Sequence, residues 1–208
     1  MTISFRAEVQ GMLRERLLDA AHQMIETSGW SSVTMAKLAS AVGVSRQTVH
    51  TELGTRHGLA EALTLRELGR FLDLVRDRMG AETDITAGIR SACQGVLELG
   101  ESSVLVRTVF GSVTDENDAD FLTILTTESG EIVELAVAVV TERVRELYPP
   151  LPLTDDELEV AAEAIVRLVL SALTRPSKPP AEAADDIAWL IELALAGARA
   201  RTRPRSSG

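Results

Sequence analysis

The hydrophobic and polar positions of this chain repeat with the period of an α-helix over most of its length. From about residue 5 to residue 28, apolar residues such as Leu17 and Ala21 recur at spacings of three and four, which places them on one helical face. The same spacing returns from about residue 56 to residue 79. The pattern therefore predicts two long helices with a shorter segment between them.

The segment between the two long helices carries two helix caps and a turn. Gly29 ends the first helix, because glycine adopts backbone conformations that other residues avoid. Thr34 and Ser45 can each accept a hydrogen bond from the free N–H groups of a new helix, and Gly43 supplies the turn between them. We expect two short helices joined by a tight turn.

The C-terminal part of the pattern predicts five further helices, about nine in all. Asp84 and Ser102 can act as N-caps, and Thr154 with Glu157 has the spacing of a capping box. The prolines of "YPPLP", residues 148–152, stop the helix before them because proline removes a backbone donor. One helix is expected to begin at Asp84 and another at Ser102. Three more are expected over about 119–148, 154–174 and 182–200, and the helix over 119–148 is either continuous or broken near Gly130.

The composition favours an all-α fold. Of the 208 residues, 45% are hydrophobic but only 3% are aromatic, so the apolar surface is mainly aliphatic and suits packed helices. The single cysteine, Cys93, cannot form an internal disulfide, and the charges near the N-terminus are unlike a secretory signal. The apolar runs are far shorter than the roughly 20 residues that span a bilayer. We expect a cytoplasmic protein without a membrane segment.

The charge is unevenly distributed along a chain whose formal net charge is −10. Residues 1–60 carry six Lys or Arg and five Asp or Glu, whereas the remainder carries 15 of the 21 basic and 26 of the 31 acidic residues. The first 60 residues are therefore near neutral and can approach a polyanion. This shift predicts a functional boundary near residue 55, and the basic tail at 201–208 is expected to be disordered.

A long helix followed by two short helices around a glycine turn has the arrangement of a helix-turn-helix, whose second short helix enters the major groove of DNA. In "VGVSRQTVH", residues 42–50, Arg46, Gln47 and Thr48 occupy the first turn of that helix. Arginine and glutamine can make bidentate contacts to guanine and adenine, and threonine can add a hydroxyl or methyl contact. The alternative for these side chains is a solvated helix face.

Residues 29–63, "GWSSVTMAKLASAVGVSRQTVHTELGTRHGLAEAL", resemble the DNA-binding region of the TetR family of transcriptional repressors. The matching positions are Gly29, Trp30, Thr34, Leu38, Ala39, Gly43, Val44, Ser45, Thr48, Val49, Gly54 and Leu59. Two positions depart from the family pattern, since Leu53 replaces a core phenylalanine and His50 replaces a tyrosine whose hydroxyl contacts a DNA phosphate. Histidine can still donate to a phosphate, and Arg56 matches a lysine with the same role. The resemblance implies a DNA-binding set of Thr34, Lys37, Ser45, Arg46, Gln47, Thr48, His50 and Arg56.

The resemblance also implies a DNA-binding domain over residues 1–55 and a helical domain over residues 56–200 that binds a ligand and dimerises. A helix-turn-helix reads one half-site, so we expect a homodimer, held through the alanine-rich last two helices. A flexible hydrocarbon or acyl chain would suit the aliphatic lining of a ligand site, and whether the effector releases or promotes DNA binding stays open. The lining residues would come from Leu68, Phe71, Leu72, Val75, Ile89, Cys93, Phe110, Phe121, Leu125 and Arg167, most of which are first of all core residues.

Two of these positions have a second interpretation. Arg167 interrupts the apolar run "AIVRLVLSAL" and needs a partner, which is either a carboxylate of the same domain or an anionic group of a ligand. Cys93 lies on an apolar helical face, so it is first of all a small buried hydrophobe, and a redox-sensing role is the less favoured alternative.

Other chemistry finds little support in the sequence. The spacing of His22, His50 and His57 matches no zinc pattern, so we expect no metal site. No Ser/His/Asp, Cys/His, paired-carboxylate or phosphate-loop arrangement is present, which argues against an enzyme and a cofactor. The expected function is a ligand-responsive repressor that a small apolar effector releases from its DNA operator. The alternative is a regulator-like protein that binds a ligand or a protein and has weak or lost DNA affinity.

Overall fold

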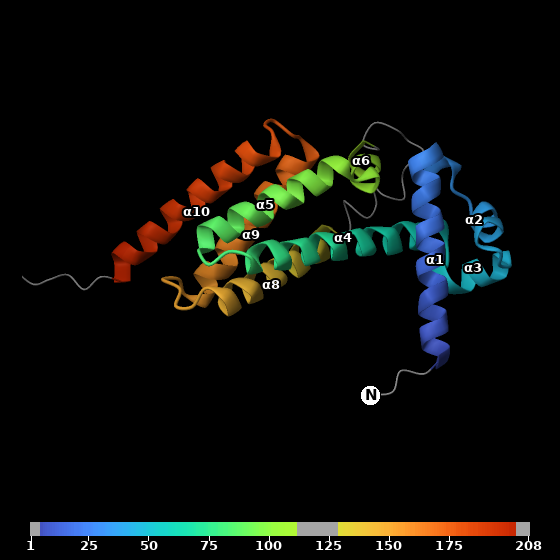
Figure 1. Cartoon of the computed structure of the whole chain (residues 1–208), viewed down its shortest axis with the longest axis horizontal. Coiled ribbons are helices and arrows are strands. Elements are labelled where there is room, and N and C mark those ends of the chain that lie inside the picture. The colour runs from blue at the N-terminus through green and yellow to red at the C-terminus, as the bar shows by residue number, and fades with distance from the viewer. Residues whose placement is uncertain (1–4, 112–128, 203–208) are drawn as a thin grey trace, which may run out of the picture. The chain divides into compact units, whose positions relative to one another are not determined.

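A computed structural model describes residues 5–111 and 129–202 of the chain (Figure 1). Over these residues the chain forms nine α-helices, one 3-10 turn and no strand, which confirms the all-α prediction. The chain divides into two compact units, one of residues 1–68 with 103–128 and the other of residues 69–102 with 129–208. The functional boundary expected near residue 55 remains a prediction.

The first unit contains three consecutive helices and parts of two others. These are α1 (Phe5–Ser28), the 3-10 turn η1 (Trp30–Ser32), α2 (Met35–Val42), α3 (Arg46–Leu53), the first part of α4 (Arg56–Gly80) and α6 (Val104–Gly111). Its core is made by large side chains that lose all contact with water, among them Leu17, Trp30, Leu38, Val49 and Leu59. Burial of this aliphatic and aromatic surface holds the short helices α2 and α3, which are too short to be stable alone.

The caps and turns of the first unit lie where the sequence predicts them. The Thr34 hydroxyl accepts a hydrogen bond from the Lys37 N–H at 3.2 Å, and the Ser45 hydroxyl accepts one from the Thr48 N–H at 3.0 Å. Gly43 ends α2 with φ 78°, a left-handed conformation that a side chain would strain. These local features fix the starts of α2 and α3 and the turn between them.

The second unit is a helical bundle of the rest of α4 with α5 (Ile85–Ser102), α8 (Ser129–Leu147), α9 (Asp155–Thr174) and α10 (Pro180–Thr202). One buried cluster joins α4, α5, α8 and α9 around Met79, Val144 and Leu158, and another joins α5, α9 and α10 around Ile89, Ile165 and Ile187. The predicted capping box of Thr154 and Glu157 is present at the start of α9. None of the described helices is long and apolar enough to cross a membrane.

Three predicted helix boundaries differ from the structure. Ser103, not Ser102, caps α6, because Ser102 is still the last residue of α5 and its hydroxyl donates to the Leu99 carbonyl. The last helix begins at Pro180, since proline suits a first helical position, and it runs to Thr202, so the tail predicted as disordered from residue 201 starts within a helix. Residues 119–128 of the predicted seventh helix and tail residues 203–208 lie outside the described residues.

Candidate nucleic-acid interface

The side chains proposed to read DNA bases stand free on the first turn of α3. Arg46 and Gln47 are both exposed, and neither side chain has a protein partner among the described residues. Thr48 is half-buried, and its hydroxyl shares a 2.8 Å hydrogen bond with the hydroxyl of the cap residue Ser45. Two long, unengaged polar side chains thus project from a helix start whose position is set by its cap.

The phosphate-contact candidates on α2 are exposed beside its first turn. Thr34 is used as the cap of α2, and the Lys37 ammonium donates to the Ser32 carbonyl at 3.0 Å. A lysine has three N–H donors, so this bond leaves two for another acceptor. The helix N-terminus and the ammonium therefore offer positive charge in the same place, which favours an anion.

His50 has one ring nitrogen engaged by its own helix. Its Nδ1 lies 2.7 Å from the Gly54 carbonyl oxygen, and its backbone carbonyl accepts from the Gly54 N–H at 2.9 Å. Both the side chain and the backbone of His50 thus bond to Gly54 at the C-terminal end of α3. His50 is an exposed residue, and its Nε2 makes no hydrogen bond within the described part of the chain.

Arg56 is held by its own chain. Its guanidinium lies over the Trp30 ring, 4.4 Å from the ring centroid, and donates to the Trp30 carbonyl at 2.8 Å. A cation over the face of an indole is attracted by the ring electrons. Arg56 therefore joins the start of α4 to η1, and the phosphate contact expected of it remains a prediction.

Arginines of α1 support α2 and α3 in a way that the sequence did not predict. Arg14 donates to the Glu52 carbonyl near the end of α3 at 2.5 Å, and Arg16 donates to the Val42 carbonyl at the end of α2 at 3.4 Å. Both bonds satisfy free carbonyls at the negative end of a helix. The only signal in the sequence was two arginines on the polar face of α1, which does not tell which carbonyls they meet.

Thr55 is a second missed residue, and here the signal was local. Its hydroxyl accepts a hydrogen bond from the Gly58 N–H at 3.2 Å and so caps α4. A threonine directly before an expected helix start is the usual signature of a cap.

The described members of the proposed ligand-site set belong to more than one part of the structure. Val75 packs against the cluster around Val144, whereas Ile89 and Cys93 belong to the cluster shared with α9 and α10. Leu72 is buried, and Leu68 and Phe71 are half-buried, with Leu68 in the first unit and Phe71 in the second. The side chain of Phe110 and residues Phe121 and Leu125 lie outside what the structure describes.

The two positions with a second interpretation are placed clearly. Arg167 is exposed on α9 and forms an ion pair with Glu163 at 2.7 Å, one turn earlier on the same helix. Its partner is thus a carboxylate of the same helix. Burial raises the pKa of the Cys93 thiol to about 12, which keeps it protonated and unreactive at neutral pH.

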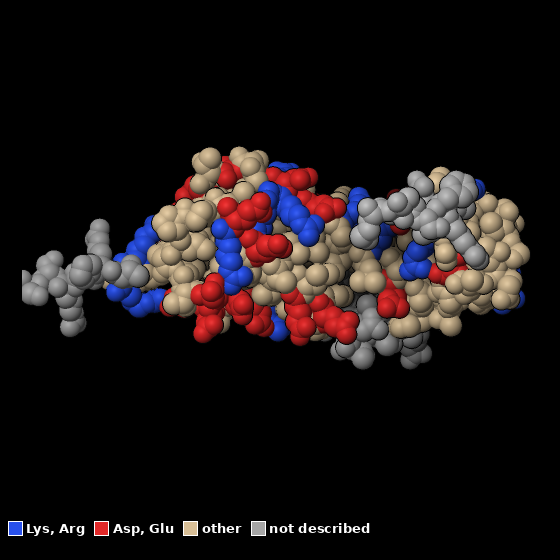
Figure 2. Space-filling model, turned by 90° about the horizontal axis from the view of Figure 1, so that it is seen from below, with Lys and Arg blue, Asp and Glu red and all other residues tan. Residues whose placement is uncertain are grey.

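Both C-terminal helices present large apolar side chains to solvent. They are Val160 and Leu168 on α9 and Trp189, Leu190 and Leu193 on α10, and we call this set the apolar face of α9 and α10. Figure 2 shows many acidic side chains over the second unit, with basic ones between them. An apolar set of this size within a charged surface is typical of a protein–protein contact.

A capped helix-turn-helix with free arginine and glutamine side chains defines a DNA-binding protein. Residues 17–67 match the family described as "Bacterial regulatory proteins, tetR family", and residues 84–192 match "Bacterial Tetracyclin repressor, C-terminal domain". The chain belongs to the TetR family of transcriptional regulators and is a ligand-responsive DNA-binding regulator.

Individual relatives agree with this assignment. The chain is 31% identical over 191 residues to the HTH-type transcriptional regulator AlkX of Mycobacterium tuberculosis, covering 91% of this chain and 88% of that protein. It is 29% identical to the TetR family repressor AlkX from Dietzia sp., implicated in biodegradation of n-alkanes, with a TM-score of 0.72 over 88% of this chain and 95% of the other. A regulator from Pectobacterium atrosepticum, 16% identical, shares the fold with a TM-score of 0.68 over 91% of this chain and 95% of the other. These relatives are regulators rather than enzymes, and they do not favour the alternative of lost DNA binding.

Proposed function

We propose that the chain is a homodimeric repressor that reads its operator with α3 and releases it when a flexible apolar molecule binds the second unit. The observation that carries the DNA-reading part is the first turn of α3, where Arg46 and Gln47 are exposed and unengaged while Ser45 fixes the helix start. Side chains left free at a fixed helix start can reach base edges in a major groove. A regulator that binds DNA in this way would act in the cytoplasm, and its proposed function includes no catalytic step.

The DNA-reading part is tested with a duplex from the region upstream of the protein's own gene. Fluorescence anisotropy should show tighter binding to this duplex than to a scrambled duplex of the same length and composition. The double variant Arg46→Ala/Gln47→Ala should bind both duplexes alike, since phosphate contacts carry no sequence information. Equal affinity of the wild-type chain for the two duplexes would argue against base reading by α3 at this sequence.

The apolar face of α9 and α10 supports the homodimer. One subunit leaves Leu168, Trp189 and Leu193 exposed, although contact between apolar side chains and water is unfavourable. Two copies that pair α9 and α10 with their symmetry mates would bury these side chains in a four-helix interface. Such a dimer would also join two copies of α3 in one molecule, as a two-part operator requires.

The aliphatic character of the second unit supports an effector with a hydrocarbon chain. The buried cluster against which Val75 packs is mainly valine, alanine and leucine, with Met79 and Tyr148 among them. The Dietzia relative is a repressor implicated in n-alkane biodegradation. Helix α4 begins in the first unit and ends in the second. A ligand held between α5, α8 and the part of α4 in the second unit can therefore act on DNA binding by displacing α4.

This effector hypothesis is tested by thermal shift with dodecane, dodecanol and dodecanoic acid, followed by operator affinity with each compound that binds. Binding of the effector and of DNA should oppose each other, with a coupling of about 1 to 3 kcal/mol. Leu72→Trp should abolish the effect of the compound while the operator affinity of the free protein is kept. A compound that binds tightly but leaves operator affinity unchanged would rule out this mechanism. A ligand with equal affinity for two conformations of the protein does not shift the equilibrium between them.

A further inference from the structure

The exposed ring of His50 has a fixed tautomer when it is neutral. Nδ1 lies 2.7 Å from the Gly54 carbonyl oxygen, and a carbonyl can only accept a hydrogen bond. Nδ1 must therefore carry the proton and donate it. A neutral imidazole has one N–H group only, so Nε2 of the neutral ring is an acceptor.

An acceptor at this position does not suit the partner expected there. The oxygens of a DNA phosphate are negatively charged and only accept hydrogen bonds. Neutral Nε2 would thus face a phosphate lone pair with its own lone pair. Protonation of the ring gives Nε2 an N–H group and a positive charge, and leaves the bond from Nδ1 to Gly54 in place.

We propose that His50 binds a DNA phosphate only as the imidazolium, so that the DNA affinity of this regulator rises as the pH falls. The proton switch rests on the DNA-binding function proposed above. Histidine is suited to such a switch because it gains and loses its proton between about pH 5 and 8. A tyrosine at the same position, as in the TetR pattern, would donate its hydroxyl proton throughout this range.

Among the residues that the structure describes, no carboxylate pairs with the His50 ring. None of the ion pairs within the described residues involves His50. Glu52 on the same helix receives its hydrogen bond from Gln10 at 3.4 Å. The DNA phosphate would therefore be the partner of the imidazolium charge. The charged and titratable groups on α3 and α2 are Arg46, Glu52 and Lys37. Those on the described part of α1 are Arg14, Glu15, Arg16, Asp19, His22 and Glu26, and those at the start of α4 are Arg56 and His57.

Two amide variants test the roles of the two His50 ring nitrogens separately. In His50→Asn the side-chain nitrogen takes the place of Nδ1, so the bond to Gly54 can persist while the distal donor is lost. In His50→Gln the side-chain nitrogen takes the place of Nε2 and donates at every pH. His22→Gln is the matched control, since it removes another histidine of the first unit, which lies 3.7 Å from Glu26.

The test is the affinity of the full chain for the upstream duplex and for a scrambled duplex, measured between pH 5.5 and 8 at several salt concentrations. For the wild type and His22→Gln, log Kd should rise with pH by up to about one unit per pH unit for each subunit. The salt slope of the wild type should be steeper at low pH by about 0.9 for each His50, because one more phosphate is neutralised. Both effects should occur on both duplexes.

Both His50 variants should lose the pH dependence of DNA affinity. His50→Asn should bind weakly at every pH, as the wild type does at pH 8, and His50→Gln should bind with an affinity that does not change with pH. A wild-type chain with the same pH and salt dependence as His50→Asn would overturn the proton switch and leave DNA binding intact. A wild-type chain that binds neither duplex at any pH, at low salt, would overturn both the switch and the proposed function.

Discussion

The side chains on α2 and α3 that we propose to bind DNA differ in how they are engaged within the protein. The Gln47 side chain has no partner among the described residues and can reach a base edge. The Lys37 ammonium donates to the Ser32 carbonyl and presents its charge beside a helix start. Contacts to bases specify a sequence, and contacts to phosphates position the protein on any sequence. The two residues should therefore fail in different ways when they are removed.

Gln47→Ala should relax base preference within the half-site by about 1 to 3 kcal/mol, because one bidentate contact is lost. Lys37→Ala should weaken binding to all duplexes alike and reduce the salt slope by about one for each subunit. Competition with single-base variants of the operator measures the preference, and a salt titration measures the slope. If both variants kept the specificity and the salt slope of the wild type, α3 would not lie in the groove as proposed.

Cys93 should be inert in the folded protein. Burial raises the pKa of its thiol from 9.0 to about 12, so the thiolate that reacts with disulfide reagents is almost absent at pH 8. We expect no labelling by a thiol-exchange reagent until the chain is unfolded. Above pH 9 the unfolded chain loses the thiol proton while the folded chain keeps it, so this group lowers stability as pH rises from 9 towards 12. Rapid labelling of the native protein at pH 8 would show that the thiol is accessible.

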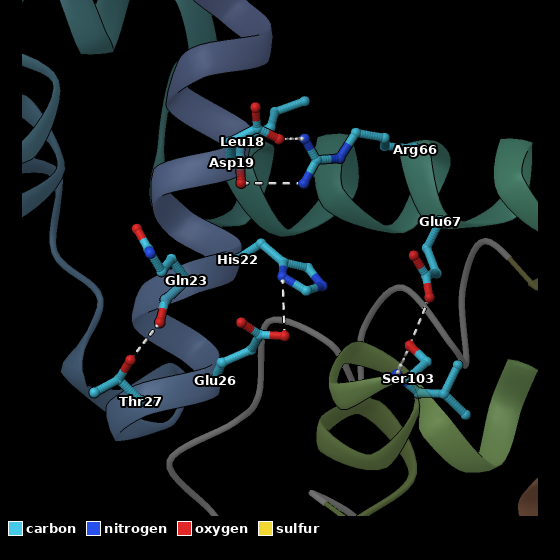
Figure 3. A network of polar contacts seen from close by, with 10 residues as sticks. Leu18, Asp19, His22, Gln23, Glu26, Thr27, Arg66, Glu67 and Ser103 are labelled. Carbon is cyan, nitrogen blue, oxygen red and sulfur yellow. Dashed lines mark hydrogen bonds and ion pairs between the residues drawn. The ribbon is translucent and has the colours of Figure 1, made fainter.

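At the scale of elements, α4 is fastened to two other helices of the first unit by adjacent residues (Figure 3). Arg66 donates to the Asp19 carboxylate at 2.7 Å and to the Leu18 carbonyl at 3.2 Å on α1. Glu67 is buried and accepts a 2.5 Å hydrogen bond from the hydroxyl of Ser103, which also caps α6. A displacement of α4 near these residues is therefore transmitted to both α1 and α6.

Ser103→Ala should lower the free energy of unfolding by about 1 to 3 kcal/mol, since it removes a helix cap and a bond to a buried carboxylate. Ser102→Ala is the matched control, and its effect should be smaller because Ser102 is exposed and its hydroxyl bonds within its own helix. Urea unfolding of the two variants measures both effects. Equal stability of the two variants would mean that the bond to Glu67 contributes little.

At the scale of the whole molecule, two large aliphatic residues on the last two helices have different surroundings. Leu168 on α9 is exposed, whereas Ile191 on α10 packs against the cluster around Ile89 and Ile187. The sequence places both on apolar stripes and does not separate a position between subunits from one inside a subunit. The structure does so because only a folded subunit shows which apolar side chains remain in contact with water.

Leu168→Arg should therefore convert the dimer into a folded monomer, because it places a charge without a partner in the proposed interface. Ile191→Arg should instead lower the melting temperature, because it places the charge against a buried cluster of one subunit. Light scattering measures the mass and circular dichroism the melting. Dissociation should also expose Trp189 and shift its fluorescence to longer wavelength. A dimer that persists in Leu168→Arg and in Trp189→Arg would place the interface elsewhere.

The sequence by itself determined the features that depend on neighbours along the chain. The caps at Thr34, Ser45 and Thr154 were predictable because a capping side chain bonds to an N–H group only three residues away. The all-α fold followed from the helical period, and the helix-turn-helix followed from the spacing of caps and glycine. The boundary at Ser102 failed because two adjacent serines can both act as caps, and a buried partner on α4 decides between them.

Only the tertiary structure decided which partner each functional side chain meets. The contact of Arg56 with Trp30 and the arginine bonds from α1 to α2 and α3 join residues far apart in sequence. The exposure of Leu168 depends on which elements cover it. Spacing along one helix gives the face of a residue but not the element that packs on it. The tautomer of His50 has the same origin, because the backbone path at Gly54 brings its carbonyl to the ring.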